Sequence, residues 1–421
     1  MVPVAGSAYT YAYASLGELV AWIIGWDLIV EYAVGNIGVA IAWAGYFQEL
    51  ISHAGLSLPA WLGTDVRSAH MAVEAIKGGA TDATTVYLAS ALDLAPRLFG
   101  VPFIANLPAF LIVALVTVIL VIGIRESANS NNAMVILKIA IILFFVAVGI
   151  TLIKPINWTN PANGGFSPHG FAGISTGAAI IFFSYIGFDA TSTAAEEAKD
   201  PARDMPFGII MSLVVCTVIY VVLAAVMTGM APWNKLGTAE PMITALSLAD
   251  GSPGLIKFSR IVVAAGAVIA MTSVLLVFQL GQPRIFLSMA RDGLLPPFLA
   301  KVHPRFRTPY VGTIITGLFV ATFAAFANIA EVVDLTNIGT LFAFVLVSVG
   351  VIVLRIKEPD RVRPFRAPWV PWTPMISVVT CLYLMYKLPT LTWIRFGVWL
   401  VLGLIIYFAY SAKHSRLRNP A

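Results

Sequence analysis

Ionisable and hydroxyl side chains stand inside otherwise apolar stretches of this sequence, and such groups can bind protons and small polar molecules. Lys138 lies in "NAMVILKIAIILFF", Glu31 in "GWDLIVEYAVGNIG" and Asp189 in "FFSYIGFDATSTAAEEAKDP", which covers positions 182–201. A charge in an apolar environment costs about 3 kcal/mol or more, so such residues are rare unless they serve a function. Each of the three is therefore a candidate functional group.

Lys138 and Glu31 could form a pair that handles a proton. Burial disfavours a charged amine, so Lys138 could release and rebind a proton, and a buried ammonium group needs a partner such as Glu31. Two alternatives stay open: Lys138 could extend to the membrane interface, and Glu31 could bond only to neighbouring helices. Asp27, one helical turn before Glu31, is expected at the interface.

The stretch 182–201 has the composition of an interrupted helix. Backbone groups at membrane depth must be hydrogen-bonded, so a break is tolerated only beside a cavity, where freed carbonyls can hold a polar substrate. Gly187 would permit the break, although close helix packing at this glycine is the alternative. Glu196 and Glu197 are expected at the cytoplasmic mouth, as a gate. The residues of this stretch expected at the substrate site are Ser184, Tyr185, Gly187 and Asp189, and the polar cluster that continues through Thr191, Ser192 and Thr193 favours the break over close packing.

The elements that would position these groups are membrane-spanning helices. The chain has 421 residues, of which 59% are hydrophobic and 11% charged, whereas a soluble domain averages about 25% charged residues. Apolar runs of about 20 residues recur along it, as a bilayer requires. We predict an all-α polytopic membrane protein with one transmembrane domain over 1–421 and a polar extracellular loop at 53–101. The ten expected spans are 18–50, 102–124, 133–153, 171–198, 207–231, 257–285, 310–329, 334–356, 372–388 and 394–412.

The charge distribution predicts the orientation. With both termini in the cytoplasm, most lysines and arginines fall on the cytoplasmic side, as membrane topology favours. The net charge of +5 is explained by this arrangement, and we expect no nucleic-acid partner. The two cysteines, Cys216 and Cys381, lie in apolar runs and are interpreted as packing residues. We found no motif typical of a metal site, a cofactor site or a catalytic nucleophile, so we expect a multi-pass protein of the cell membrane that is not an enzyme.

Four long segments resemble one family, the amino acid–polyamine–organocation superfamily, in its cationic amino acid transporter branch. They are "PVAGSAYTYAYASLGELVAWIIGWDLIVEY" (3–32), "FFSYIGFDATSTAAEEAKDPARDMP" (182–206), "VFQLGQPRIFLSMARDGLLP" (277–296) and "LTNIGTLFAFVLVSVGVIVLR" (335–355). They resemble, in order, the family's third, sixth, eighth and tenth helices with adjoining loops. The match covers nearly the whole chain.

The resemblance implies a five-plus-five inverted-repeat fold with two extra C-terminal helices. It places the backbone carbonyls of Phe183 and Ile186 on the amino group of the substrate. It also implies that Lys138 replaces the cation that sodium-coupled relatives hold, and that Glu31 faces this lysine. The residues implied near the same cavity, with weaker support, are Met271, Thr272 and Ser273.

The sequence departs from the family at its start. Met1 stands where the family has the end of its second helix, so ten spans are expected here where the family has twelve. We expect the sequence to be truncated, with two more apolar spans encoded upstream of Met1.

The function that these features predict is secondary transport of α-amino acids, coupled to protons and directed inward. The substrates are cationic or small neutral amino acids, and the expected partners are the amino acid, protons and the lipid bilayer. An amino acid exchanger or sensor without proton coupling is the alternative, because one fold hosts several functions.

Overall fold

The computed structural model describes residues 9, 13, 16–79, 83–123, 128–161, 164–187, 200–360, 363 and 365–416. The described part of the chain is almost entirely helical. Its α-helices are α2 (Glu18–Ile29), α3 (Gly35–His53), α4 (Val66–Lys77), α5 (Ala83–Leu94), α6 (Leu107–Ile122), α7 (Ala128–Thr151), α8 (Ile156–Thr159), α9 (Gly170–Ile181), α10 (Pro201–Met230), α11 (Pro241–Leu248), α12 (Pro253–Arg291), α13 (Tyr310–Phe326), α14 (Ile329–Lys357), α15 (Trp372–Lys387), α16 (Thr390–Ile406) and α17 (Ala412–His414).

Shorter elements connect or extend these helices. Two π-helical segments, η1 (Val30–Val34) and η8 (Tyr407–Ser411), follow α2 and α16 without a break in the helix. The 3-10 segments are η2 (Ala60–Leu62), η4 (Phe182–Tyr185), η6 (Trp233–Lys235) and η7 (Pro297–Ala300). One small antiparallel hairpin pairs β1 (Arg97–Leu98) with β2 (Val101–Pro102).

Six of the described helical stretches are long and apolar enough to cross a membrane by length and composition. They are Glu18–His53, Ala133–Thr151, Arg203–Met230, Pro253–Arg291, Ile329–Lys357 and Thr390–His414. Three shorter apolar stretches are Leu107–Ile122, Gly170–Tyr185 and Tyr310–Phe326. The number of spans and the inverted repeat stay predictions.

Several helices begin outside the apolar runs from which their spans are predicted. The structure starts α10 at Pro201, α12 at Pro253 and α14 at Ile329. Proline is favoured in the first turn because it has no N–H group to leave unpaired. For α14, the side chain of Asn328 accepts a hydrogen bond from the N–H of Ala330 at 3.1 Å and caps the helix. Proline in the first turn of α10 and α12, and a side-chain cap at α14, therefore mark these starts.

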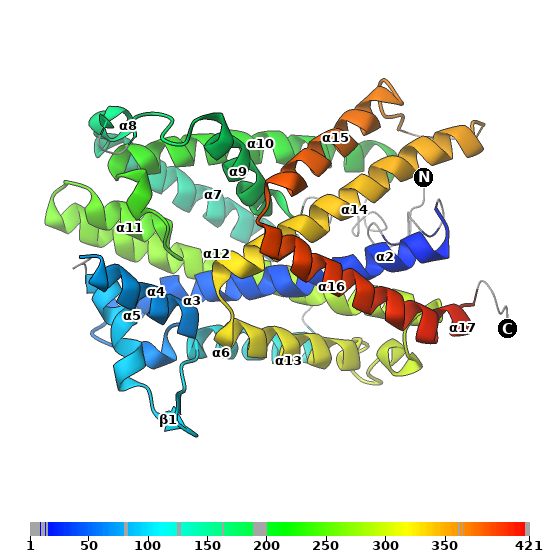
Figure 1. The fold of residues 1–421 in the computed structure, drawn as a ribbon, viewed down its shortest axis with the longest axis horizontal. Helices are drawn as coiled ribbons and strands as arrows, with labels where there is room; N and C mark the ends of the chain where they lie inside the picture. Colours follow the sequence, from blue (N-terminus) through cyan, green and yellow to red (C-terminus); the bar gives the residue numbers. More distant parts are fainter. Residues whose placement is uncertain are drawn as a thin grey trace.

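The long helices lie side by side in one bundle (Figure 1). The beginning of α2 and the end of α17 lie at one end of the bundle, and α4, α5, α8 and α11 lie at the other. At the first of these ends, Tyr407 donates a 2.8 Å hydrogen bond to Glu18, and Ser415 donates another. The segment 53–101, predicted as a polar extracellular loop, contains η2, α4, α5 and β1, and the hairpin continues to Pro102.

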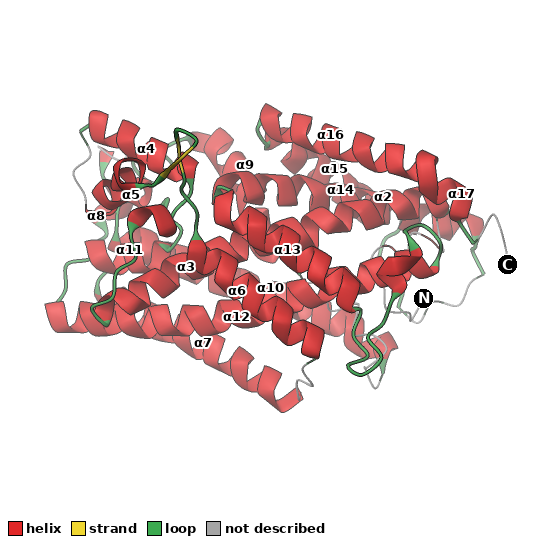
Figure 2. Cartoon of the chain, turned by 90° about the horizontal axis from the view of Figure 1, so that it is seen from below, coloured by secondary structure: helices red, strands yellow, loops and turns green. Residues whose placement is uncertain are grey.

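The helix α3 runs through the interior of the bundle, as the view from below also indicates (Figure 2). It packs against α12, α6, α13 and α14. Small and branched apolar side chains fill these contacts, including the fully buried Ala40, Ala44 and Val320. Small residues permit close approach of helix backbones, which is how helices associate inside membranes.

Candidate functional site

The helix α9 and its 3-10 extension η4 end at the glycine that the sequence singles out. The α-helix ends at Ile181, η4 continues to Tyr185, and Ile186 is extended with φ −62° and ψ 134°. Gly187 follows with φ +112°, a conformation that residues with a Cβ atom rarely adopt. The backbone therefore leaves the helix at Ile186 and Gly187, in the middle of a predicted span.

Two polar residues of neighbouring helices bind the backbone before the break. Asn337 of α14 donates hydrogen bonds to the carbonyls of Ala179 (3.1 Å) and Ile180 (2.9 Å), and its side chain is fully buried. Tyr220 of α10 donates a 2.7 Å bond to the carbonyl of Ser184. The last carbonyls of a helix commonly lack hydrogen-bond donors in their own helix. Asn337 and Tyr220 act as donors to these carbonyls. We did not predict either residue, although each stands as a polar residue in an apolar run.

The predicted substrate groups on η4 already have contacts within the protein. The carbonyl of Phe183 accepts a 3.2 Å hydrogen bond from the N–H of Ile186. The hydroxyl of Tyr185 donates to Thr217 of α10 at 3.1 Å, whereas the Ser184 residue is exposed. A carbonyl oxygen has two lone pairs, so Phe183 keeps the capacity to accept one further hydrogen bond.

Lys138 of α7 meets one of the three residues predicted on α12. Its ammonium group donates a hydrogen bond to the hydroxyl of Ser273, which is buried. The hydroxyl of Thr272 instead accepts a 3.0 Å bond from the indole N–H of Trp43. Met271 packs with the apolar core. The structure thus brings Lys138 and Ser273 together and directs Thr272 toward α3.

Glu31 lies in the π-helical segment η1 and is buried, with 1% of its surface exposed. A π-helical segment widens the helix by one residue and often marks a functional site. The sequence gives no direct signal for this geometry. The predicted pairing of Glu31 with Lys138 stays a prediction.

Asp27, which is expected at the membrane interface, is buried among the helices of the bundle. Its side chain is 1% exposed and lies against α14, where a Cβ atom added at Gly339 would stand 2.9 Å from a carboxylate oxygen of Asp27. Among the described residues, neither oxygen of this carboxylate has a hydrogen-bond partner. The packing of α14 against the last turn of α2 buries Asp27 inside the bundle.

A polar connection crosses the bundle between α3 and α6. Asn36 donates a 2.7 Å hydrogen bond to the side-chain oxygen of Gln279, and the Gln279 amide donates to Thr117 at 3.3 Å. Asn36 and Gln279 are both buried. Sequence reasoning did not identify these three residues, because their hydrogen bonds form only when Gln279 of α12 meets Asn36 of α3 and Thr117 of α6.

Ion pairs gather at the end of the bundle where α4 and α5 lie. Arg260 of α12 binds the Glu49 carboxylate with a 2.8 Å hydrogen bond, and His53 contacts the same oxygen at 3.0 Å.

Burial, and then the nearby charge of Glu49, raise the pKa of Glu240 above its usual value of 4.5. The carboxyl group of Glu240 therefore holds its proton more tightly in the folded protein than in the unfolded chain.

The remaining predicted residues cannot be placed. Asp189 and the gate residues Glu196 and Glu197 lie outside the described residues. Within the described part of the chain, no group of three or more His, Cys, Asp or Glu residues is arranged to hold a metal ion.

A bundle of long apolar helices, one of which ends at Gly187 and one of which carries the half-buried Lys138, is the arrangement of a polytopic membrane protein. The family model described as "Amino acid permease" matches residues 1–410. The chain therefore belongs to the amino acid permease family of the amino acid–polyamine–organocation superfamily.

Curated relatives cover almost the whole chain. The branched-chain amino acid permease BcaP of Bacillus subtilis (strain 168) is 44% identical over 418 residues, which is 99% of this chain and 82% of that protein. The methylthioribose transporter of the same organism is 42% identical over 421 residues, with the same two shares. The vacuolar cationic amino acid transporter 4 of Arabidopsis thaliana is 36% identical over 361 residues, which is 86% of this chain and 54% of that protein.

Proposed function

We propose that this protein imports α-amino acids by alternating access and couples their movement to protons. Amino acid transport follows from membership of the family and from the names of the relatives. The finer proposal rests on one observation, the contact of Lys138 with Ser273 between α7 and α12.

The substrate site of this proposal is the interruption of α9. The turn at Ile186 and Gly187 ends the helix, and the carbonyl of Phe183, which accepts one hydrogen bond from Ile186, keeps a lone pair for a substrate. The backbone carbonyls of Phe183 and Ile186 would accept hydrogen bonds from the substrate ammonium group, with Asp189 nearby in the sequence. Backbone carbonyls recognise the amino group that all α-amino acids share, and the side-chain pocket sets which substrate is preferred.

The proton site of this proposal is Lys138. The Lys138 amine donates to Ser273 and so links α7 to α12, and in our proposal this contact belongs to the protonated state. A neutral amine binds a hydroxyl more weakly than an ammonium group does, because hydrogen bonds from charged donors are about twice as strong. Loss of the proton would therefore loosen the α7–α12 contact and allow the helices to move. Glu31 would stabilise the charged form.

The energy available is sufficient for accumulation. One proton that moves inward across 100 mV supplies about 2.3 kcal/mol. At about 1.4 kcal/mol for each factor of ten, this supports roughly 50-fold accumulation of a neutral substrate.

The test is uptake of labelled amino acids by the purified protein in liposomes, with and without an inward pH gradient. We expect Lys138→Met to abolish the dependence on the gradient and Ser273→Ala to weaken it. Lys257→Met is the matched control, because Lys257 is an exposed lysine near the beginning of α12, and it should keep the wild-type response. A Lys138→Met protein with the same gradient dependence as the wild type would remove Lys138 from coupling.

The competing function, exchange without protons, has its own readout. Liposomes loaded with unlabelled amino acid at equal internal and external pH would take up label rapidly if the protein is an exchanger. Branched-chain, cationic and small neutral amino acids compete with the label in the same assay, and their order of potency defines the substrate class.

A further inference from the structure

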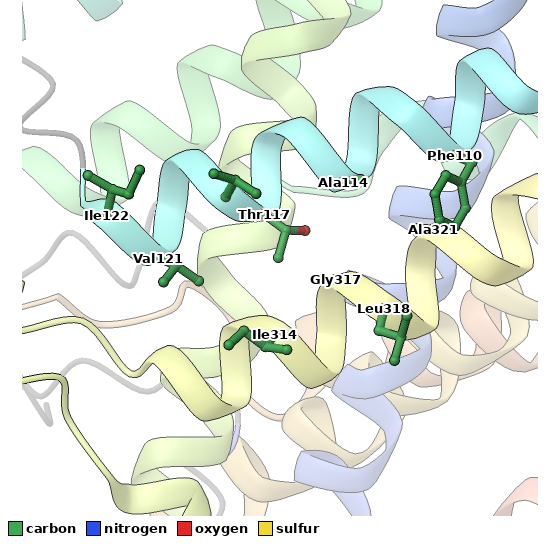
Figure 3. A pocket seen from close by; sticks show the side chains of 10 residues that line it. Phe110, Ala114, Thr117, Val121, Ile122, Ile314, Gly317, Leu318 and Ala321 are labelled. Atoms are coloured by element: carbon green, nitrogen blue, oxygen red, sulfur yellow. The ribbon is translucent and has the colours of Figure 1, made fainter.

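A groove between α6 and α13 stands apart from the proposed transport site. It has a volume of about 350 Å³ and is lined almost entirely by apolar atoms. Figure 3 shows the two helices side by side, with Ile122 and Ile314 toward one end and Phe110 and Ala321 toward the other. The exposed fraction of Leu318 is 64%, so the groove opens outward from the bundle.

The groove has no polar group to offer a water-soluble ligand. Thr117 is its one hydroxyl residue, and that hydroxyl donates to the carbonyl of Val113 at 2.7 Å and accepts from Gln279. At membrane depth, such a surface is complementary to hydrocarbon, because a polar ligand would lose its hydrogen bonds there.

A basic loop closes one end of this groove. Thr308 donates a 2.9 Å hydrogen bond to the carbonyl of Val121, which joins the loop before α13 to the last turn of α6. The exposed residues Lys301, Arg305 and Arg307 lie in this loop. No ion pair within the described part of the chain involves them. Three cations without acidic partners therefore lie at the end of an apolar groove.

The loop that carries these cations is held in one shape. The ring nitrogen Nδ1 of His303 accepts hydrogen bonds from the backbone N–H groups of Arg305 (3.2 Å) and Phe306 (3.1 Å). The backbone N–H of Arg307 donates to the carbonyl of His303 at 2.9 Å. Groups that are ordered before binding lose less entropy when a ligand arrives.

We propose that this site binds an anionic phospholipid, with an acyl chain in the α6–α13 groove and the phosphate group against the basic loop. Charge complementarity favours this occupant, since arginine pairs well with phosphate oxygens and the loop lies on the predicted cytoplasmic side. A second copy of the chain is the competing occupant. It would place three exposed cations beside the membrane without an anionic partner.

The test uses the full chain purified in detergent and titrated with phosphatidylglycerol or with phosphatidylcholine carrying the same acyl chains, with bound lipid counted by native mass spectrometry. We expect tighter binding of phosphatidylglycerol by the wild type. Each basic residue near a membrane surface contributes about fivefold, so Arg305→Gln with Arg307→Gln should reduce the preference about 10- to 30-fold. Arg366→Gln, which removes an exposed arginine of another loop, should not change it.

The acyl chain is located by a phosphatidylglycerol that carries a photoreactive group at mid-chain. We expect cross-links within 107–122 and 310–326, and their loss in Ala114→Phe, which fills the groove. Ala224→Phe on α10 is the control, because Ala224 is exposed and distant in sequence. Equal binding of the two lipids, cross-links that map elsewhere, or protein–protein cross-links at the groove would each overturn the proposal. The single variants Arg305→Gln and Arg307→Gln provide the same test if the double variant does not fold.

Discussion

Asn337 offers a direct test of the contact that holds the interrupted helix. Its buried amide donates two hydrogen bonds, to the carbonyls of Ala179 and Ile180. Asn337→Leu keeps a side chain of similar size and removes both donors. The two carbonyls then lose their side-chain partner in the last turn of α9, which leads into the substrate site of our proposal.

The expected loss of stability in Asn337→Leu follows from the number of hydrogen bonds that are removed. A hydrogen bond contributes about 0.5–1.5 kcal/mol net, and membrane-protein measurements average about 0.6 kcal/mol. Two bonds therefore give a loss of about 1–3 kcal/mol in the free energy of unfolding. At about 2.1 cal/mol/K per residue, the unfolding entropy of a chain of 421 residues is about 0.9 kcal/mol/K, so Tm should fall by about 1–3 °C.

The assay is thermal unfolding of the wild type and variants in the same detergent at one heating rate, because membrane proteins often unfold irreversibly. Thr340→Val is the matched control, since Thr340 is buried one turn further along α14 and its hydroxyl has no hydrogen-bond partner among the described residues. It should keep or raise Tm. Asn337→Leu should also weaken the stabilisation by bound amino acid. If Asn337→Leu and Thr340→Val behave alike in both measurements, the two bonds do not hold the interruption.

Three further predictions concern the break and the ion pairs. Gly187→Ala should lower the free energy of unfolding by about 1–3 kcal/mol, measured by thermal unfolding, because alanine is strained at this positive φ. The added methyl group meets no atom within 4 Å, so a steric clash would not contribute. Gly177→Ala, inside α9 and equally uncrowded, should not destabilise the protein, and equal losses in the two variants would refute the strain argument. The raised pKa of Glu240 means that its contribution to stability is complete below pH 4.5, its unfolded value, and is lost as the pH rises through the folded value. Glu240→Gln should therefore flatten the decline of Tm with pH, and an unchanged slope would refute this role of Glu240. Glu331→Gln removes the carboxylate that pairs with two arginines, one on α4 and one on α16. The free energy of unfolding should fall by up to about 1 kcal/mol per pair, and by less at high salt. A loss that does not depend on salt would indicate a packing effect instead.

The sequence by itself determined the features that depend on neighbouring residues along the chain. Runs of apolar side chains predict where membrane helices lie, because each side chain carries its own transfer free energy. The departure of the backbone from the helix at Gly187 could be expected for the same reason, since tolerance of a positive φ is a property of glycine itself. Four long motifs were sufficient to identify the family.

The tertiary structure decided which polar groups meet. Lys138 reaches Ser273 across 135 positions, and Asn337 reaches Ile180 across 157. The neighbours Thr272 and Ser273 point to different partners, because successive residues of a helix face different directions. Asp27 changes from an expected interfacial residue to a buried one when α14 packs over it. Contacts of this kind arise from helix packing. The order of residue types along the chain does not specify which neighbouring helix each face of a helix packs against.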